Sequence, residues 1–176
     1  LGSTFFKEMI THTPQSWVID PAELPPHAAI PGLELTNWRQ LGEMSQRERN
    51  LVLKVSGFSE RAWGARGLYV GSDLSQADWS EAVECALAEF NFSPWVLQRY
   101  HKPRRMQQEW FDFESNKKRM MDGRVRLCPY YFVVGKGDSA KAQLGGILAT
   151  VCQANKKVIH GMPEAILTPC TVINDD

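Results

Sequence analysis

The hydrophobic pattern changes its period several times between residues 51 and 100, and this succession of patterns restricts the fold. Residues 51–55 (LVLKV) are apolar apart from one lysine, which predicts a strand. Residues 68–71 (LYVG) predict a second short strand, and the segment between the two, 56–67, contains three glycines. We therefore expect a hairpin with a long tip over residues 51–71.

A helix is expected after this hairpin. Ser75 is a suitable N-cap, and the apolar residues of 76–90 recur at helical spacing. They are Trp79, Val83, Ala86, Leu87 and Phe90. Residues 94–100 (PWVLQRY) predict a third strand, so the stretch reads strand, glycine loop, strand, helix, strand.

The N-terminal residues predict fewer regular elements. Residues 3–12 are typical of a helix that Pro14 prevents from continuing, and residues 17–19 predict a short strand. Residues 20–45 contain four prolines. We expect a loop-rich connection there, with one turn of helix around residues 38–44.

Strands predominate beyond residue 103. The expected strands are 108–113, 125–134, 144–151 and 165–173, with a turn at 115–118 and a loop at 135–142. Pro129 interrupts one of these strands, which indicates a sheet edge or a bulge. Because no crossover helix separates the strands, we expect an antiparallel sheet.

These patterns predict an α+β fold in three segments. Residues 1–45 supply an N-terminal helix, a strand and a proline-rich connection. Residues 46–103 form a small lid subdomain of antiparallel strands with one helix. Residues 104–176, joined by residues 1–20, form part of a larger subdomain built on an antiparallel sheet.

The net charge of zero conceals an uneven distribution. Residues 1–98 carry a net charge of −5 and residues 99–176 a net charge of +5, with histidine neutral. Basic residues concentrate in one cluster: Arg99, Lys102, Arg104, Arg105, Lys117, Lys118, Arg119, Arg124 and Arg126. Such a cluster suits a polyanion, either a nucleoside triphosphate or a nucleic acid, but a solvated face has the same composition.

Cysteine spacing and apolar runs exclude several classes of protein. The four cysteines form no CxxC or zinc-binding pattern, so we interpret them as structural thiols in a reducing cytoplasm. No apolar run approaches the about 20 residues of a membrane-spanning helix, and no signal peptide is recognisable. We expect a cytoplasmic protein without a membrane partner. Because the sequence begins with Leu1, we interpret it as a piece of a longer chain.

Lys54 is the first candidate for chemistry. It interrupts an apolar strand, where an ammonium must find a partner or solvent, and Gly57, Gly64 and Gly67 follow it. Backbone amides of a glycine-rich loop can approach phosphate oxygens, and a neighbouring lysine adds positive charge. The loop is neither a Walker A loop nor a dinucleotide-binding fingerprint. A surface lysine on a hairpin whose glycines serve turns would show the same pattern.

The order of elements over residues 3–105 resembles the ATP-grasp superfamily. Its members run as lysine-bearing helix, Thr-Pro, strand, apolar strand with a second lysine, glycine loop, strand, helix, and a strand that ends in a hinge. The corresponding stretches here are FFKEM, TPQSWVI, LVLKVSGF, WGARGLYVG and WVLQRY. The stretches RVRLCPYYFV and GGILAT are similar to strands that follow the hinge in some bacterial members.

The resemblance implies an ATP site in a cleft between a small lid and a larger sheet. Lys7 and Lys54 would contact ATP phosphates, and Arg124 or Arg126 would act as a catalytic residue on the β- or γ-phosphate. The glycine loop would fold over the phosphates, and the hinge would present backbone groups to adenine. The residues involved are Ser56, Gly57, Gly64, Arg66, Gly67, Gln98, Arg99 and Tyr100.

By the same resemblance, the reaction would be an ATP-dependent ligation. An unidentified carboxylate attacks the γ-phosphate to give an acyl phosphate, and an amine or thiol then displaces phosphate, with Mg²⁺ neutralising charge. Glu114–Ser115–Asn116 matches the letters of a magnesium motif, but the segment predicts a turn, so the metal ligands stay unknown. A circularly permuted, glutathionylspermidine-synthase-like chain would carry them before Lys7. The 176 residues alone would then be inactive.

A second hypothesis is a non-catalytic module that binds a nucleotide or RNA. Aromatic residues near the basic cluster suit stacking on bases: Trp110, Phe111, Phe113, Tyr130 and Tyr131. We expect ATP and the remainder of a longer chain as partners in preference to nucleic acid. His101 lies beside the hinge and is a candidate for contact with ribose or phosphate, whereas His160 fits a loop or core position.

Overall fold

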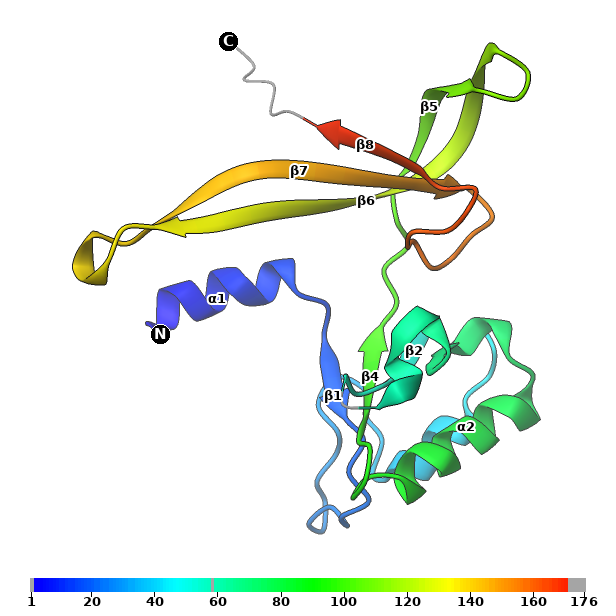
Figure 1. Ribbon diagram of the computed structural model, residues 1–176. Helices are drawn as coiled ribbons and strands as arrows, with labels where there is room; N and C mark the ends of the chain where they lie inside the picture. Colours follow the sequence, from blue (N-terminus) through cyan, green and yellow to red (C-terminus); the bar gives the residue numbers. More distant parts are fainter. Residues whose placement is uncertain (1, 58, 171–176) are drawn as a thin grey trace. The chain divides into compact units, whose positions relative to one another are not determined.

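The structure is a computed structural model that describes residues 2–57 and 59–170. The chain divides into two compact units, residues 1–101 and residues 102–176. The described residues form two four-stranded antiparallel sheets, two α-helices and four short 3₁₀ helices (Figure 1). The predicted combination of helices with antiparallel sheets is therefore confirmed.

The sheet of the first unit has the order β1-β4-β2-β3. Its strands are β1 (Ser16–Val18), β2 (Leu51–Val55), β3 (Leu68–Val70) and β4 (Trp95–Arg99). The predicted hairpin is confirmed, since Val52 of β2 lies opposite Val70 of β3. Strand β4 lies inside the sheet, between β1 and β2.

One expectation about this sheet is wrong. We expected residues 1–20 to join the second, larger sheet, but β1 pairs with β4, with Trp17 opposite Leu97. The physical reason is burial, because pairing with β4 lets Trp17 pack against the buried cluster that contains Leu97. A strand of three residues carries too little pattern to indicate which sheet accepts it.

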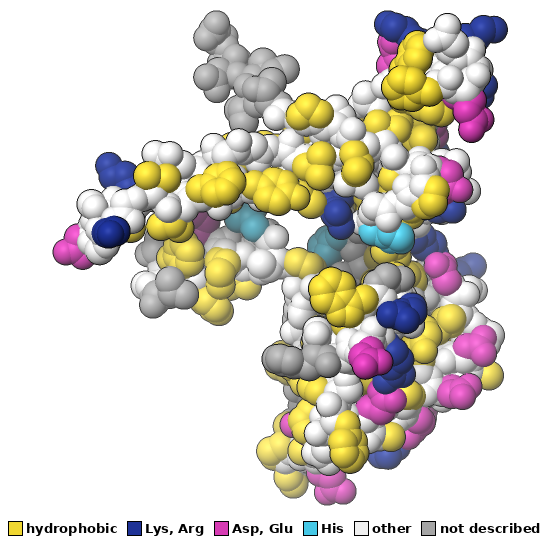
Figure 2. Space-filling view, viewed as in Figure 1, with side chains coloured by type: hydrophobic (Ala, Val, Ile, Leu, Met, Phe, Trp, Pro, Cys, Tyr) yellow, Lys and Arg dark blue, Asp and Glu magenta, His cyan; other side chains and the backbone are white. Residues whose placement is uncertain are grey.

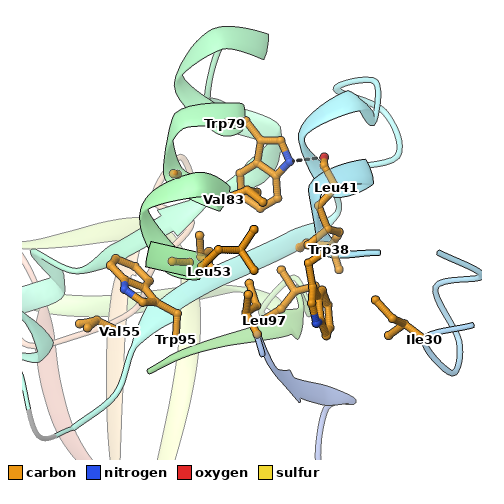
Figure 3. Close-up of a cluster of buried hydrophobic side chains, with 14 residues drawn as sticks. Ile30, Trp38, Leu41, Leu53, Val55, Trp79, Val83, Trp95 and Leu97 are labelled. Atoms are coloured by element: carbon orange, nitrogen blue, oxygen red, sulfur yellow. Dashed lines mark hydrogen bonds between the residues drawn. The ribbon is translucent and has the colours of Figure 1, made fainter. Parts of the chain in front are cut away.

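Helix α2 (Gln76–Ala88) covers one face of this sheet and supplies much of its core. It begins where the sequence predicts, because the Ser75 hydroxyl accepts a hydrogen bond from the backbone N–H of Asp78. Trp79 is fully buried, and its indole N–H donates to the carbonyl of Leu41 at 2.7 Å (Figure 3). Leu41 belongs to the 3₁₀ helix η1 (Trp38–Glu43), which is the helical turn expected near residue 38.

The remaining segments of the first unit are short. The 3₁₀ helix η2 (Glu60–Ala65) occupies much of the loop between β2 and β3, and η3 (Gly71–Asp73) follows β3. Helix α1 (Ser3–His12) has the predicted bounds but buries none of its residues. It exposes four large apolar side chains: Phe5, Phe6, Met9 and Ile10.

The second unit is the predicted antiparallel sheet, with the order β5-β6-β7-β8. Its strands are β5 (Arg105–Asp112), β6 (Lys117–Val134), β7 (Lys141–Gln153) and β8 (Ile166–Cys170), and η4 (Gly137–Ser139) lies between β6 and β7. Strand β6 is longer than expected because it also pairs with β5. The last residues of the strand expected at 165–173 lie outside the described part of the chain.

Pro129 lies on an edge, as the sequence predicts. Strand β5 pairs with β6 only as far as Arg124, so the rest of β6 has β7 on one side and no described strand on the other. The register of the β6–β7 ladder shifts between Tyr130 and Tyr131, directly after the proline. Proline lacks the N–H that an inner strand must donate, which accounts for this position.

None of the helices in the described residues combines the length and apolar character needed to cross a membrane.

Candidate functional site

Lys54 lies on the face of the first sheet that is turned away from the α2 core. Its Cα partners are Val96 on β4 and Leu68 on β3, whereas the neighbouring residues Leu53 and Val55 belong to the core. The ammonium Nζ donates to Oε1 of Gln98 at 2.6 Å. Lys54 is therefore held across the sheet by a residue that is also a candidate site residue.

The hydrogen bond continues across the sheet. The Gln98 amide Nε2 donates to the hydroxyl of Ser16 at 2.8 Å. Residues of β2, β4 and β1 are thereby joined in one chain of donors and acceptors. The carboxamide has used its oxygen toward Lys54 and one N–H toward Ser16, so its orientation is fixed by both neighbours.

The charge of Lys54 is incompletely compensated. The side chain is partly buried, and this burial lowers the pKa of the ammonium because the charged form loses water. Gln98 is a neutral acceptor, and no carboxylate of residues 2–57 or 59–170 forms an ion pair with Lys54. A partly desolvated cation with only an amide partner favours the approach of an anion.

The loop that follows β2 is closed at both ends by backbone contacts. Ser56 donates its N–H to the carbonyl of Pro94 at 2.9 Å, and its hydroxyl is buried without a partner among the described residues. Gly67 donates its N–H to the carbonyl of Arg61, and its carbonyl accepts from the N–H of Val55. A Cβ at Gly67 would lie 2.3 Å from a Val55 methyl carbon. Gly67 therefore allows a close approach that a larger residue would prevent.

Other loop residues have separate roles. Gly57 is exposed, and a Cβ there would meet no atom within 4 Å. Arg66 donates to the carbonyls of Trp63 and Glu60, both at 3.2 Å, and so closes the end of η2, in which Gly64 also lies.

Arg61 and Glu89 fix η2 to the core, although nothing in the sequence indicates this pair. Arg61 forms an ion pair with Glu89, and its guanidinium lies 5.5 Å from the ring centroid of Trp95. The fully buried Trp95 donates its indole N–H to the same Glu89 oxygen at 2.8 Å. Burial alone would raise the pKa of Glu89, but the hydrogen bonds from Trp95 and Arg61 outweigh burial and lower it.

The backbone of the expected hinge is largely occupied by other contacts. The N–H of Arg99 donates to the carbonyl of Gln15, and the N–H of Tyr100 donates to that of Asn50, both at 3.0 Å. The Arg99 guanidinium donates to the Gly32 carbonyl at 2.6 Å. An adenine edge at this segment would therefore have to be recognised by groups other than these two N–H donors.

The other expected phosphate ligands belong to other elements of the chain. Lys7 lies exposed on α1, a helix without buried residues. Arg124 and Arg126 belong to the second unit. Arg124 is buried and donates to the carbonyls of Ala154 at 2.8 Å and Pro103 at 2.6 Å, whereas Arg126 is exposed opposite Thr150 on β7.

No metal centre is found in the described part of the chain. Within it, no group of three or more His, Cys, Asp or Glu side chains could hold a metal ion. Glu114–Ser115–Asn116 forms the turn between β5 and β6, with Asn116 in the left-handed region at φ 53°. The Asp112 carboxylate accepts hydrogen bonds from the backbone N–H and hydroxyl groups of this turn. These letters therefore form a hairpin turn here.

Three of the nine members of the basic cluster are paired with carboxylates among the described residues. Acidic side chains are interspersed with basic ones at the β5–β6 end (Figure 2). The three ion pairs are Arg105–Asp122, Lys118–Glu109 and Arg119–Asp112. With Arg99 and Arg124 bound to carbonyls, the cluster presents fewer unpaired cations to a polyanion than its composition indicates.

No family model matches the chain, and comparisons with curated proteins and with solved structures find no match either.

Proposed function

We propose that the first unit binds ATP and that Lys54 is a ligand of its phosphates. The observation that carries this proposal is the partly buried Lys54 ammonium, which lies 2.6 Å from a neutral amide and beside the loop that begins at Ser56. A phosphate oxygen would supply the negative charge that Gln98 lacks. A lysine binds phosphate as a compact point charge, which suits a nucleotide whose phosphates must be exchanged.

The loop supplies the second part of the proposed site. The Ser56 hydroxyl has no partner among the described residues, and Gly57 has open space where a side chain would be. An approaching phosphate would therefore meet an accessible stretch of backbone at Gly57, next to the buried Ser56 hydroxyl. The Arg61–Glu89 ion pair would keep η2, the middle of the loop, in place when phosphate binds.

We further propose that this ATP site serves a ligase of the ATP-grasp type, in a longer chain. Such an enzyme would activate a carboxylate as an acyl phosphate and transfer the acyl group to an amine or a thiol. Arg124, one of the two arginines expected to contact the transferred phosphate, is buried and donates to two carbonyls. Mg²⁺, when bound, would neutralise the β- and γ-phosphates.

Two observations support this reading over an RNA-binding module. The Lys54 ammonium, which lacks a carboxylate partner, is in the first unit. Most of the basic cluster lies in the second unit, where three of its members are paired with carboxylates. Affinity for RNA depends on several unpaired cations acting together. A triphosphate is bound through an ammonium together with loop backbone amides, and Lys54 with the loop from Ser56 would supply these groups.

Calorimetric titration tests the proposal. The chain is titrated with MgATP, with adenosine, and with single-stranded RNA at two salt concentrations. We expect MgATP to bind and adenosine to bind more weakly, because the phosphates provide the main contact. Tight RNA binding that weakens steeply with salt, together with no heat from MgATP, would establish the RNA-binding module instead.

A further inference from the structure

The second unit contains a cavity of about 550 Å³ that no part of the proposed nucleotide site uses. Strands β5 and β6 form one wall, and the residues just before β8 form another. Its lining consists of Trp110, Asp112, Phe113, Glu114, Arg119, Met121, Gln153, Pro163, Glu164, Ala165 and Ile166. The volume lies within the range of about 300–1,000 Å³ that is usual for sites of small organic ligands.

The strand register explains why these side chains meet. Trp110 lies directly opposite Arg119, so both point to the same face of the sheet. Asp112 and Met121 are two residues further along each strand and therefore share that face. Phe113 and Glu114 follow Asp112 in the turn, and Glu164 comes from the segment before β8.

The charges of the lining favour a cation. The cavity has three carboxylates and one guanidinium. Arg119 forms an ion pair with Asp112, with Nε 2.8 Å from Oδ2. Asp112 also accepts a hydrogen bond from the Ser115 hydroxyl at 2.6 Å. Within the described residues neither Glu114 nor Glu164 has an ion pair, so both carboxylates remain available to a ligand.

The apolar part of the lining favours an organic ligand. Trp110 and Phe113 offer aromatic surface beside the two free carboxylates, and Met121 and Ile166 add aliphatic surface. Aromatic faces attract ammonium and guanidinium groups through the ring quadrupole. A hydrated inorganic cation would gain little from these side chains.

We propose that this cavity binds a small organic cation, with its ammonium or guanidinium group at Glu114 and Glu164 and its apolar part against Trp110. The cavity lies wholly within the second unit, so this inference does not rest on the proposed ATP site, and either can fail alone.

The test compares three ligands of nearly equal shape by NMR titration of the 176-residue chain. Benzylammonium is the cation, benzyl alcohol its neutral counterpart and benzoate the anion. We expect benzylammonium to bind about tenfold more tightly than benzyl alcohol, and benzoate to bind more weakly than either. Equal affinities for the three ligands, or no binding by benzylammonium at millimolar concentration, would overturn the proposal.

Charge-neutral variants locate the site. Glu164→Gln, and Glu114→Gln with Glu164→Gln, keep the side-chain shape and change only exposed residues, so the fold is expected to persist and is checked by the thermal midpoint. The double variant should lose the tenfold preference for the cation. Glu109→Gln is the matched control, because Glu109 lies opposite Met120 on the other face of β5 and pairs with Lys118. An unchanged preference in the double variant would contradict the assignment.

Discussion

The ammonium of Lys54 lies 2.6 Å from the amide oxygen of Gln98, and these two residues come from β2 and β4, 44 positions apart in the sequence. The contact satisfies one of the three ammonium donors without neutralising the charge. Burial meanwhile lowers the pKa of Lys54, because the charged form has lost part of its water. A bound phosphate would reverse this effect, since an anion stabilises the protonated lysine.

This relationship predicts a pH dependence for ATP binding. We expect the affinity for MgATP to fall in alkaline solution as Lys54 loses its proton, starting below the ordinary lysine pKa of about 10.4. Lys54→Arg should extend binding to higher pH, because a guanidinium stays protonated throughout this range. Calorimetric titrations between about pH 7 and 10 measure the two profiles. Identical profiles for the two proteins would exclude Lys54 as the titrating group.

Glu89 is predicted to stabilise the first unit through Trp95 more than through its ion pair. Glu89→Ala leaves the buried indole N–H of Trp95 without its acceptor, which should cost about 1–3 kcal/mol of unfolding free energy. Glu84→Ala is the control, since Glu84 lies on α2, which ends just before Glu89, and forms an exposed pair with Arg39. It should change stability by less than about 1 kcal/mol. Urea denaturation measures both values, and equal losses would contradict this account.

Two of the three loop glycines, Gly57 and Gly67, should respond differently to alanine. At Gly67 a Cβ would lie 2.3 Å from a Val55 methyl carbon, so Gly67→Ala should lower the unfolding free energy by about 1–3 kcal/mol. At Gly57 a Cβ meets nothing within 4 Å, so Gly57→Ala should change stability by less than about 0.5 kcal/mol. Urea denaturation of the two variants provides the comparison. A larger loss of unfolding free energy for Gly57→Ala than for Gly67→Ala would contradict this description of the loop.

The first unit also shows which features a sequence can reveal. Helix α2 and strand β2 follow from local periodicity and a Ser75 cap, so both could be located in advance. The acceptor of Lys54 could not be located, because Gln98 reaches it diagonally across a strand pairing whose register is not local information. The ion pair between Arg61 and Glu89 could not be located either, because the two residues are 28 positions apart and no local sequence pattern links them. The glycines of residues 56–67 indicated an open loop and gave no sign of η2.

Acid should weaken the β5–β6 hairpin through Asp112. Its pKa is lowered, first by the Ser115 hydroxyl and further by backbone N–H groups and Arg119, which outweigh burial. Because the folded form holds this proton less tightly than the unfolded chain, the stabilisation is present at neutral pH and is lost as pH falls below about 4. Asp112→Asn should flatten this acid dependence, measured by amide exchange in the hairpin. Asp138→Asn, in the exposed β6–β7 turn, should leave the acid dependence of the β5–β6 hairpin unchanged.

The affinity of MgATP for Lys54→Ala and for Lys141→Ala, measured side by side with the thermal midpoints, tests the central claim most directly. Lys141 is an exposed lysine at the start of β7, in the second unit, and serves as the control. We expect Lys54→Ala to weaken binding by about 1.5–3 kcal/mol, roughly 10- to 160-fold, with little change in the midpoint. Lys141→Ala should bind as the unmodified chain does. Equal affinities in the two variants would contradict a phosphate contact at Lys54 and, with it, the proposed nucleotide site.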